Sequence, residues 1–342
     1  MAAGGRERQL ILFAVAALLG GIVFLWALYL MRDVLLVLYV SGLLAIGFSP
    51  LVRRFERGFG RRGRLGLPRW AAIFALYVGL LVIVGLAIAV VLPPFVRQAR
   101  ALWLDLPRYI DMVQGALVRA GLMSSEWTSA DLIAHLPNPG FAVAQIVGAL
   151  QSVAGVAGTV VTVVILPYYL LLESDALGHT FIKVFAHERR PQVARVAESM
   201  TQKVGAWLGG QLLLSVIIGI STAIGLWLLG VPYFYVFAVI AAFGELIPVV
   251  GPILAAIPAV LVAFSVSAQT GVFVAAYFGL QQFLENQFIV PRVMEKQVGV
   301  SAVTVIVALL IGTQLLGIAG ALLAVPSAAI VQVLAQEYLE RE

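Results

Sequence analysis

Two carboxylates stand in stretches of sequence that are otherwise apolar. Glu245 lies within AAFGELIPVVGP and Glu285 lies within QQFLENQF. A carboxylate at membrane depth costs roughly 2.5–3.5 kcal/mol on insertion scales unless it is paired, neutralised or in contact with water. Such a group is retained mainly where it carries a proton or binds a cation. Glu245 is therefore the first candidate for a coupling residue; the alternative is a solvated carboxylate at a hairpin tip near the interface.

Amide side chains accompany Glu285. Gln281 and Glu285 are four residues apart, as are Gln282 and Asn286, so a helix would carry two adjacent polar stripes. A polar stripe facing lipid is unstable, so we expect this face to look into the bundle or into a cavity. Hydrogen bonding between helices is the structural alternative, and an interfacial position for Glu285 is also open.

Proline and glycine interrupt the apolar sequence between 226 and 331 repeatedly. Interrupted helix at membrane depth is tolerated only where protein or a water-filled cavity satisfies the freed backbone groups, and transporter sites are commonly built this way. Thr313 and Gln314 lie at a glycine-rich turn that could bind an ion or a polar solute, or could simply allow tight packing. The residues expected to shape the hairpins are Pro248, Gly251, Pro252, Pro258, Gly312, Gly317, Gly320 and Pro326.

The composition indicates an integral membrane protein. Hydrophobic residues make up 62% of the 342 residues and charged residues 11%, with a mean hydropathy of +1.03. The absence of cysteine excludes disulfides, thiolate metal sites and cysteine nucleophiles, and the three histidines show no ligand spacing. The net charge of +5 comes from basic loops rather than from a nucleic-acid site. No Walker loop, HExxH or GxSxG occurs, so we expect neither an enzyme nor a cofactor or metal.

Loop charge orients the predicted spans. The loop at 51–69 carries seven arginines against Glu56 alone, which predicts a cytoplasmic position. Counting from it places both termini in the cytoplasm and 93–140 outside, as a helical insertion that packs on the bundle or acts as a lid. The predicted regions are N-terminal spans at 1–92, this insertion at 93–140, a span and a cytoplasmic amphipathic helix at 141–203, a transport core at 204–334 and a cytoplasmic tail at 335–342.

The transport core is predicted to contain two hairpins, at 233–264 and 300–331. A single crossing by the first stretch would place Arg292 and Lys296 outside, whereas a hairpin returns them to the cytoplasm and obeys the positive-inside rule. The second stretch is longer than one span needs. A span plus a hairpin, followed by a span plus a hairpin of opposite orientation, makes an inverted-topology repeat. The predicted fold class is an all-α polytopic bundle of about eight hydrophobic segments.

The chain resembles the autoinducer-2 exporter family over nearly its whole length. The segments that carry the resemblance are PYYLLLESD, GELIPVVGPILAAIPAVLVAF and ENQFIVPRVMEKQVGVSAVTVIVALLIGTQLLGIAGALLAVPSAAIV. The resemblance implies a bacterial inner-membrane secondary transporter, linked either to export of a quorum-sensing signal or to sodium/proton antiport, and a homo-oligomer such as a pentamer. Ser301 and Ala302 stand where family members often carry a His-Pro pair, so the substrate does not follow from the resemblance.

Three functions remain in view. The first is export of a small polar signalling molecule or metabolite by alternating access. The second is sodium (or lithium)/proton antiport, which requires at least one carboxylate within the membrane; Glu245 would meet this requirement. The third is a scaffold that holds partner membrane proteins and transports nothing. The expected partners are the lipid bilayer and a small polar solute, a proton or a sodium ion, with no nucleic acid.

Overall fold

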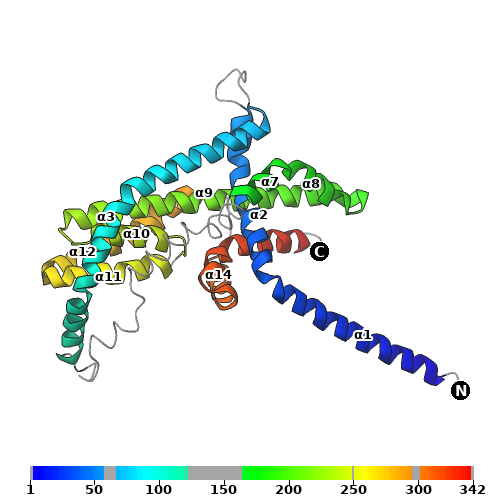
Figure 1. The fold of residues 1–342 in the computed structure, drawn as a ribbon, viewed down its shortest axis with the longest axis horizontal. Coiled ribbons are helices and arrows are strands. Elements are labelled where there is room, and N and C mark those ends of the chain that lie inside the picture. Colours follow the sequence, from blue (N-terminus) through cyan, green and yellow to red (C-terminus); the bar gives the residue numbers. More distant parts are fainter. Residues whose placement is uncertain are drawn as a thin grey trace.

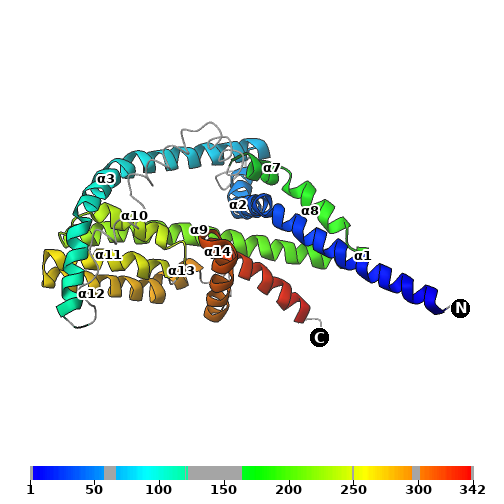
Figure 2. The same cartoon turned by 60° about the horizontal axis from the view of Figure 1, so that its bottom comes forward.

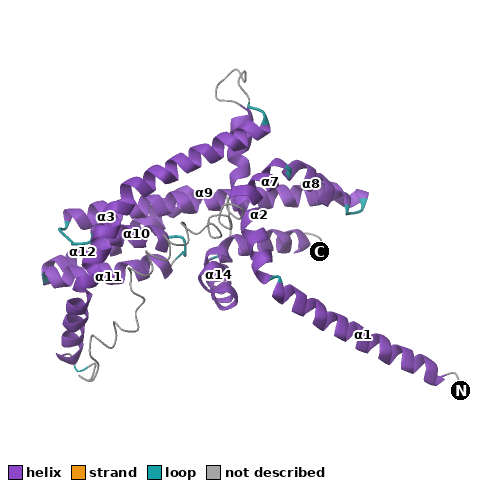
Figure 3. Cartoon of the chain, in the orientation of Figure 1, coloured by secondary structure: helices purple, strands orange, loops and turns teal. Residues whose placement is uncertain are grey.

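The computed structural model describes residues 3–57, 67–119, 121, 164–248, 250–294 and 301–339. These residues form helices joined by short connections, with no strand among them (Figure 3), which confirms the all-α prediction. In the described part of the chain, four helices are long and apolar enough to cross a membrane, and three shorter apolar helices accompany them. These helices are those of a multi-pass membrane protein.

The first helix, α1 (Ala3–Leu30), points away from the rest of the chain (Figure 1). Its apolar side chains are widely exposed, with Leu25 at 66% and Phe24 at 64%. Apolar side chains left uncovered in this way are expected of a helix surrounded by lipid. Helix α2 (Arg32–Arg57) begins with the ion pair Arg32–Asp33, whose atoms are 3.7 Å apart.

Helix α3 (Arg69–Arg119) continues without a break through Pro93 and Pro94. The sequence predicts a span that ends at 92 and a separate insertion after it, whereas the structure places 93–119 on the same arched helix (Figure 2). Internal proline is tolerated in membrane helices because neighbours satisfy the freed carbonyls. The remainder of the predicted insertion, apart from Gly121, lies outside the described residues.

The second half of α3 packs on the bundle. Its face at Leu102 and Tyr109 lies against a buried cluster that includes Phe237 and Ala259. The Tyr233 hydroxyl donates a hydrogen bond to Asp105, and the Tyr235 amide donates one of 3.0 Å to Gln98. This part of the region predicted as an insertion therefore packs on the bundle.

A second group of contacts joins α2 and α3 to α7 (Leu166–Leu172) and α8 (Ser174–Lys183). Arg69 donates to the carbonyl of Leu171, at 2.9 and 3.1 Å, and also to the side chains of Ser174 and Asp175. Its guanidinium therefore satisfies a carbonyl at the end of α7 and fixes the start of α8. Asp175 is held by this arginine although it remains exposed.

Helix α9 (Arg190–Leu228) is the long central element, preceded by the 3₁₀ turn η2 (His187–Arg189). It contacts α2 near its middle and α10 over its second half, as Figure 1 shows. The crossing with α2 is close because Gly47 faces Leu208 and Gly205 faces the backbone of Ile46. Small residues at such crossings let membrane helices pack by van der Waals contact.

The first predicted hairpin is formed by α10 (Phe234–Gly244) and α11 (Val250–Val266). The chain reverses between Gly244 and Gly251, so Val262 and Ala263 return to the end of α9 at which Leu226 and Val231 lie. Helix α12 (Ala268–Leu284) starts from that end and runs back along α11. It continues into the π-helical turn η3 (Glu285–Ile289) and the short α13 (Val290–Met294).

The second predicted hairpin is α14 (Ala302–Leu339), which breaks at Gly317. This glycine has φ 61° and ψ −138°, a backbone conformation that L side chains rarely adopt. Gly312 and Gly320 meet across the turn, where a Cβ on either would overlap the other's backbone. The returning arm continues as helix to Leu339, past the predicted end of the hairpin at 331. Pro258 and Pro326 lie inside helical segments rather than at the breaks.

Candidate functional site

The break between α10 and α11 is built on two glycines. The backbones of Gly244 and Gly251 are in contact, so that a Cβ on Gly244 would lie 2.9 Å from the carbonyl oxygen of Gly251. Pro248 lies in the turn and Pro252 lies in the first turn of α11, where a missing N–H leaves no unsatisfied donor. The two helices therefore approach closely at the position where the backbone reverses.

Glu245 is the first residue after α10, directly at this break. Its side chain is 2% exposed, and its Oε2 atom makes no hydrogen bond among the described residues. Burial of an ionised carboxylate without a partner is strongly unfavourable. The environment of Glu245 therefore favours a bound proton or a nearby cation.

Gln211 of α9 contacts the backbone at the break between α10 and α11. It is 3% exposed, and its side-chain amide donates a hydrogen bond to the backbone carbonyl of Glu245. Carbonyls at the end of a helix lack partners within that helix, and in an apolar environment such a carbonyl needs a substitute donor. One side chain of α9 thus holds the broken end of α10 in place.

Glu285 is the second buried carboxylate, 6% exposed, at the first position of η3. Gln282 lies one turn earlier, and the side chains of both residues line the same pocket. Single π-helical turns are frequent at functional sites because they change the direction in which side chains point. Glu285 faces the bundle, whereas Asn286 and the residues after it in η3 are exposed up to Phe288. The structure therefore does not bring Asn286 to the pocket described next.

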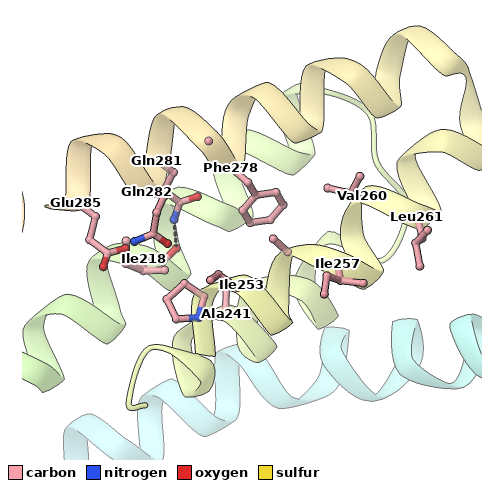
Figure 4. A pocket seen from close by; sticks show the side chains of 13 residues that line it. Ile218, Ala241, Ile253, Ile257, Val260, Leu261, Phe278, Gln281, Gln282 and Glu285 are labelled. Carbon is pink, nitrogen blue, oxygen red and sulfur yellow. Dashed lines mark hydrogen bonds between the residues drawn. The ribbon is translucent and has the colours of Figure 1, made fainter. Parts of the chain in front are cut away.

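A pocket of about 410 Å³ lies between α9, α11 and α12 (Figure 4). One end is polar, formed by Gln281, Gln282 and Glu285, and the rest of the wall is apolar. Its apolar lining includes Ile218, Ala241, Ile253, Ile257, Val260 and Phe278. A concave, mostly apolar site with a few convergent polar groups is the usual form of a small-molecule site.

Hydrogen bonds to α9 orient the polar end. The Gln281 amide donates to Ser221 Oγ at 3.0 Å and to Thr222 Oγ1 at 3.2 Å, and it lies 3.5 Å from the Ile218 carbonyl. Tyr277, one turn earlier, donates to the carbonyl of Ser221 at 2.7 Å. Thr222 is fully buried. These bonds fix Gln281 to α9 and leave Gln282 and Glu285 directed toward the pocket.

Glu245 and Glu285 are close enough for their charges to interact, although only Glu285 lines the pocket. Neither takes part in a salt bridge within the described residues, where the ion pairs involve Arg32 and Arg69. No group of three or more metal-ligating residues occurs in that part of the chain either. Two acids without a basic partner are suited to a proton or a single monovalent cation. The added positive charge reduces the cost of burying the carboxylates and the repulsion between them.

The remaining predicted residues lie in the second hairpin. Thr313 and Gln314 are exposed on the first arm of α14, and the Thr313 hydroxyl donates to the Leu309 carbonyl at 2.6 Å. They do not line the pocket. The two hairpins nevertheless meet, because Ile247 in the first turn packs against the buried cluster of Leu309, Ala321 and Ala324.

Sequence reasoning missed the polar groups of α9. Gln211, Ser215 and Thr222 lie on one face, at steps of four and seven residues, and all three are buried. Periodic polar residues inside an apolar span are a signal of an inward-facing stripe. Read with Gln281, this stripe would have indicated that α9 forms the wall opposite α12.

Comparison with known proteins shows similarity to transport proteins. A family model described as AI-2E family transporter matches residues 12–340. The chain is 27% identical to the "Putative transport protein YueF" of Bacillus subtilis over 86% of its length and 81% of that protein. It is 25% identical to the AI-2 transport protein TqsA of Escherichia coli over 78% of each chain. With a match over nearly its whole length, the chain belongs to the AI-2E family of membrane transporters.

Proposed function

We propose that this chain is a cation-coupled secondary transporter that exports a small polar organic solute by alternating access. The solute occupies the pocket between α9, α11 and α12, with Gln282 and Glu285 binding its polar groups. Glu245 carries the coupling proton or cation. The observation that carries the proposal is the burial of Glu245, without a hydrogen bond to Oε2, at the backbone break beside this pocket.

The size and polarity of the pocket support a solute of small size. About 410 Å³ accommodates a molecule of metabolite dimensions. Its polar groups lie at one end, so a bound solute would present its hydroxyl or carbonyl groups to Gln282 and Glu285. Autoinducer-2 is the first substrate to test, because it is the solute in the printed name of the relative TqsA.

The two hairpins support alternating access. Each consists of a chain reversal with two glycines in contact, at Gly244 and Gly251 and again at Gly312 and Gly320. If α9 and α12 cross the bilayer in opposite directions, the hairpins enter from opposite sides and meet at Ile247. Broken elements of this kind, related by an inverted repeat, gate a central site by rocking against one another.

Two further properties belong to the proposal. The arginines at 53, 54 and 57 favour a cytoplasmic position for the end of α2, with both termini inside and the chain in the bacterial inner membrane. Family resemblance favours a homo-oligomer such as a pentamer. Widely exposed apolar side chains on α1 and α3 offer a surface for lipid or for neighbouring copies.

The test is solute flux in proteoliposomes under an imposed proton or sodium gradient. Efflux of autoinducer-2 should follow the gradient in the wild type and become independent of it in Glu245→Gln, which removes the charge and keeps the shape. Glu188→Gln, at an exposed acid of η2, is the matched control and should transport as the wild type does. Gradient-driven efflux in Glu245→Gln would refute the role assigned to Glu245.

Sodium/proton antiport is the second candidate, and the interaction of Glu245 with Glu285 favours it. Two acids that share a site bind either a proton or a sodium ion more readily than both together. Addition of sodium or lithium to vesicles that contain a pH dye should then release protons without any organic solute. A flat trace in sealed vesicles that do transport autoinducer-2 would dismiss the antiport function.

A further inference from the structure

A second and larger cavity lies apart from the proposed transport pocket, at the other end of α9. It has a volume of about 800 Å³ and is enclosed by α2, by α7 with α8, and by the first half of α9. Nothing in the transport proposal uses it. Its walls come from three segments that are far apart in the sequence, so the fold itself creates the cavity.

The polarity of this cavity changes along α2. Its inner end is lined by Gly42, Ala45, Ile46 and, from α7, Leu170. One to two turns further along, α2 contributes Ser49, which is 8% exposed, and then Arg53 and Arg54. An apolar channel therefore leads to a polar opening within a single groove.

The polar end has an excess of positive charge. Arg53 and Arg54 are exposed, and neither forms a salt bridge with any residue that the structure describes. Of the two acids in the wall, Asp175 is paired with Arg69, and Glu198 accepts a 3.4 Å hydrogen bond from Gln202. The two guanidinium groups are thus available to an anionic ligand.

Hydrogen-bonding side chains from the other two walls complete this end. Ser174 and His179 come from α8 and Gln202 comes from α9, whereas the Thr201 hydroxyl donates to the Ala197 carbonyl at 2.9 Å. Guanidinium groups bind phosphate oxygens in a bidentate manner, and hydroxyl groups supply additional bonds to the same oxygens. This is the chemistry that recognises a phosphate ester with neighbouring hydroxyl groups.

We propose that the groove between α2, α8 and α9 binds an anionic phospholipid, with Arg53 and Arg54 at its phosphate and an acyl chain along Ala45, Ile46 and Leu170. Basic pockets at the ends of membrane helices bind anionic lipid headgroups in this way. A soluble phosphate ester would use the two arginines but would leave the apolar channel unfilled. A lipid has both a phosphate for the charged end of the groove and an acyl chain for its apolar end, so the lipid is the ligand that we propose.

Lipid binding here would tie three separate elements together. The phosphate contacts α2, the hydroxyl-bearing headgroup contacts α8 and α9, and the chain fills the space between α2 and α7. The bound lipid would therefore stabilise the packing of this end of the molecule, where the contacts between α8 and α9 are few.

The test is a titration of the detergent-solubilised protein with phosphatidylglycerol, followed by native mass spectrometry, with phosphatidylcholine and inorganic phosphate as parallel probes. The double variant Arg53→Gln with Arg54→Gln should bind phosphatidylglycerol about 30-fold more weakly. Each basic residue near the membrane surface contributes about 1 kcal/mol to such binding, and 1.4 kcal/mol corresponds to tenfold.

Two further variants separate a binding effect from a folding effect. Arg53→Lys with Arg54→Lys keeps the charge and should retain most of the affinity. Arg97→Gln with Arg100→Gln removes two exposed arginines of α3, outside the groove, and should bind as the wild type does. Equal binding of phosphatidylcholine and phosphatidylglycerol would overturn the proposal, as would an equal loss in the α3 variant. Displacement of phosphatidylglycerol by millimolar phosphate would assign the groove to a soluble phosphate ester instead.

Discussion

Substitution of Gly251 by alanine probes the contact on which the first hairpin depends. The added Cβ would overlap the carbonyl group of Gly244 and lie 2.9 Å from its Cα atom, whereas carbon atoms pack at about 3.5–4.0 Å. The obstructing atoms belong to the backbone, so no side chain can rotate away. The two helices must separate, and the carbonyl of Glu245 then moves away from Gln211.

The expected destabilisation follows from these two effects. Overpacking typically costs about 1–3 kcal/mol, and loss of the hydrogen bond to a buried carbonyl costs about 1–3 kcal/mol more. Alanine regains up to about 1 kcal/mol through its higher helix propensity. The net loss in the free energy of unfolding is about 1–6 kcal/mol. At roughly 2–4 °C for each kcal/mol, Tm should fall by about 2–24 °C, with a central value near 10 °C.

Thermal unfolding in detergent, followed by intrinsic tryptophan fluorescence, measures this change. Gly209→Ala in α9 is the matched control, because a Cβ at that position meets no atom within 4 Å. The control should leave Tm unchanged or raise it by a few degrees. A Tm for Gly251→Ala equal to that of the control would refute the close contact between the two glycines.

Three other perturbations test separate parts of the structure. Gln211→Leu keeps the approximate volume but removes the donor to the Glu245 carbonyl, so Tm should report a loss of about 1–3 kcal/mol; no loss would mean that another donor serves this carbonyl. Arg69→Gln should destabilise the fold by about 2 kcal/mol, because it removes charged hydrogen bonds to α7 and α8, and a wild-type unfolding curve would contradict that role. In this cysteine-free chain, Gln269→Cys should react with an impermeant thiol reagent from outside the cell and Glu188→Cys only after permeabilisation; the reverse pattern would invert the proposed topology.

The sequence was informative where the signal is local. Glu245 and Glu285 could be selected because a carboxylate in an apolar stretch is unfavourable wherever the chain places it. The hairpins could be predicted because Gly251, Gly312 and Gly317 interrupt segments that exceed or break a single span. Each of these predictions depends only on a short stretch of neighbouring residues. The structure forms both chain reversals at these glycines.

The sequence was uninformative where the partners are distant. Gln211 is one amide in a long apolar helix, and its partner lies 34 residues away. The ion pair of Arg69 with Asp175 spans 106 residues. Asn286 was expected beside Gln282 on an ordinary helix, but the π-helical turn that begins at Glu285 changes the spacing of the faces. Such features depend on tertiary packing, which no short pattern records.

The support of the first hairpin has a mechanical consequence. Its base is tied to α3 by the bonds of Tyr233 and Tyr235 to Asp105 and Gln98, and its tip rests on α14 through Ile247. A hairpin that is held at its base and contacted by another helix at its tip is displaced mainly at the tip when that helix moves. Glu245 lies two residues from Ile247, so a displacement of α14 is transmitted to the carboxylate through the tip of the hairpin.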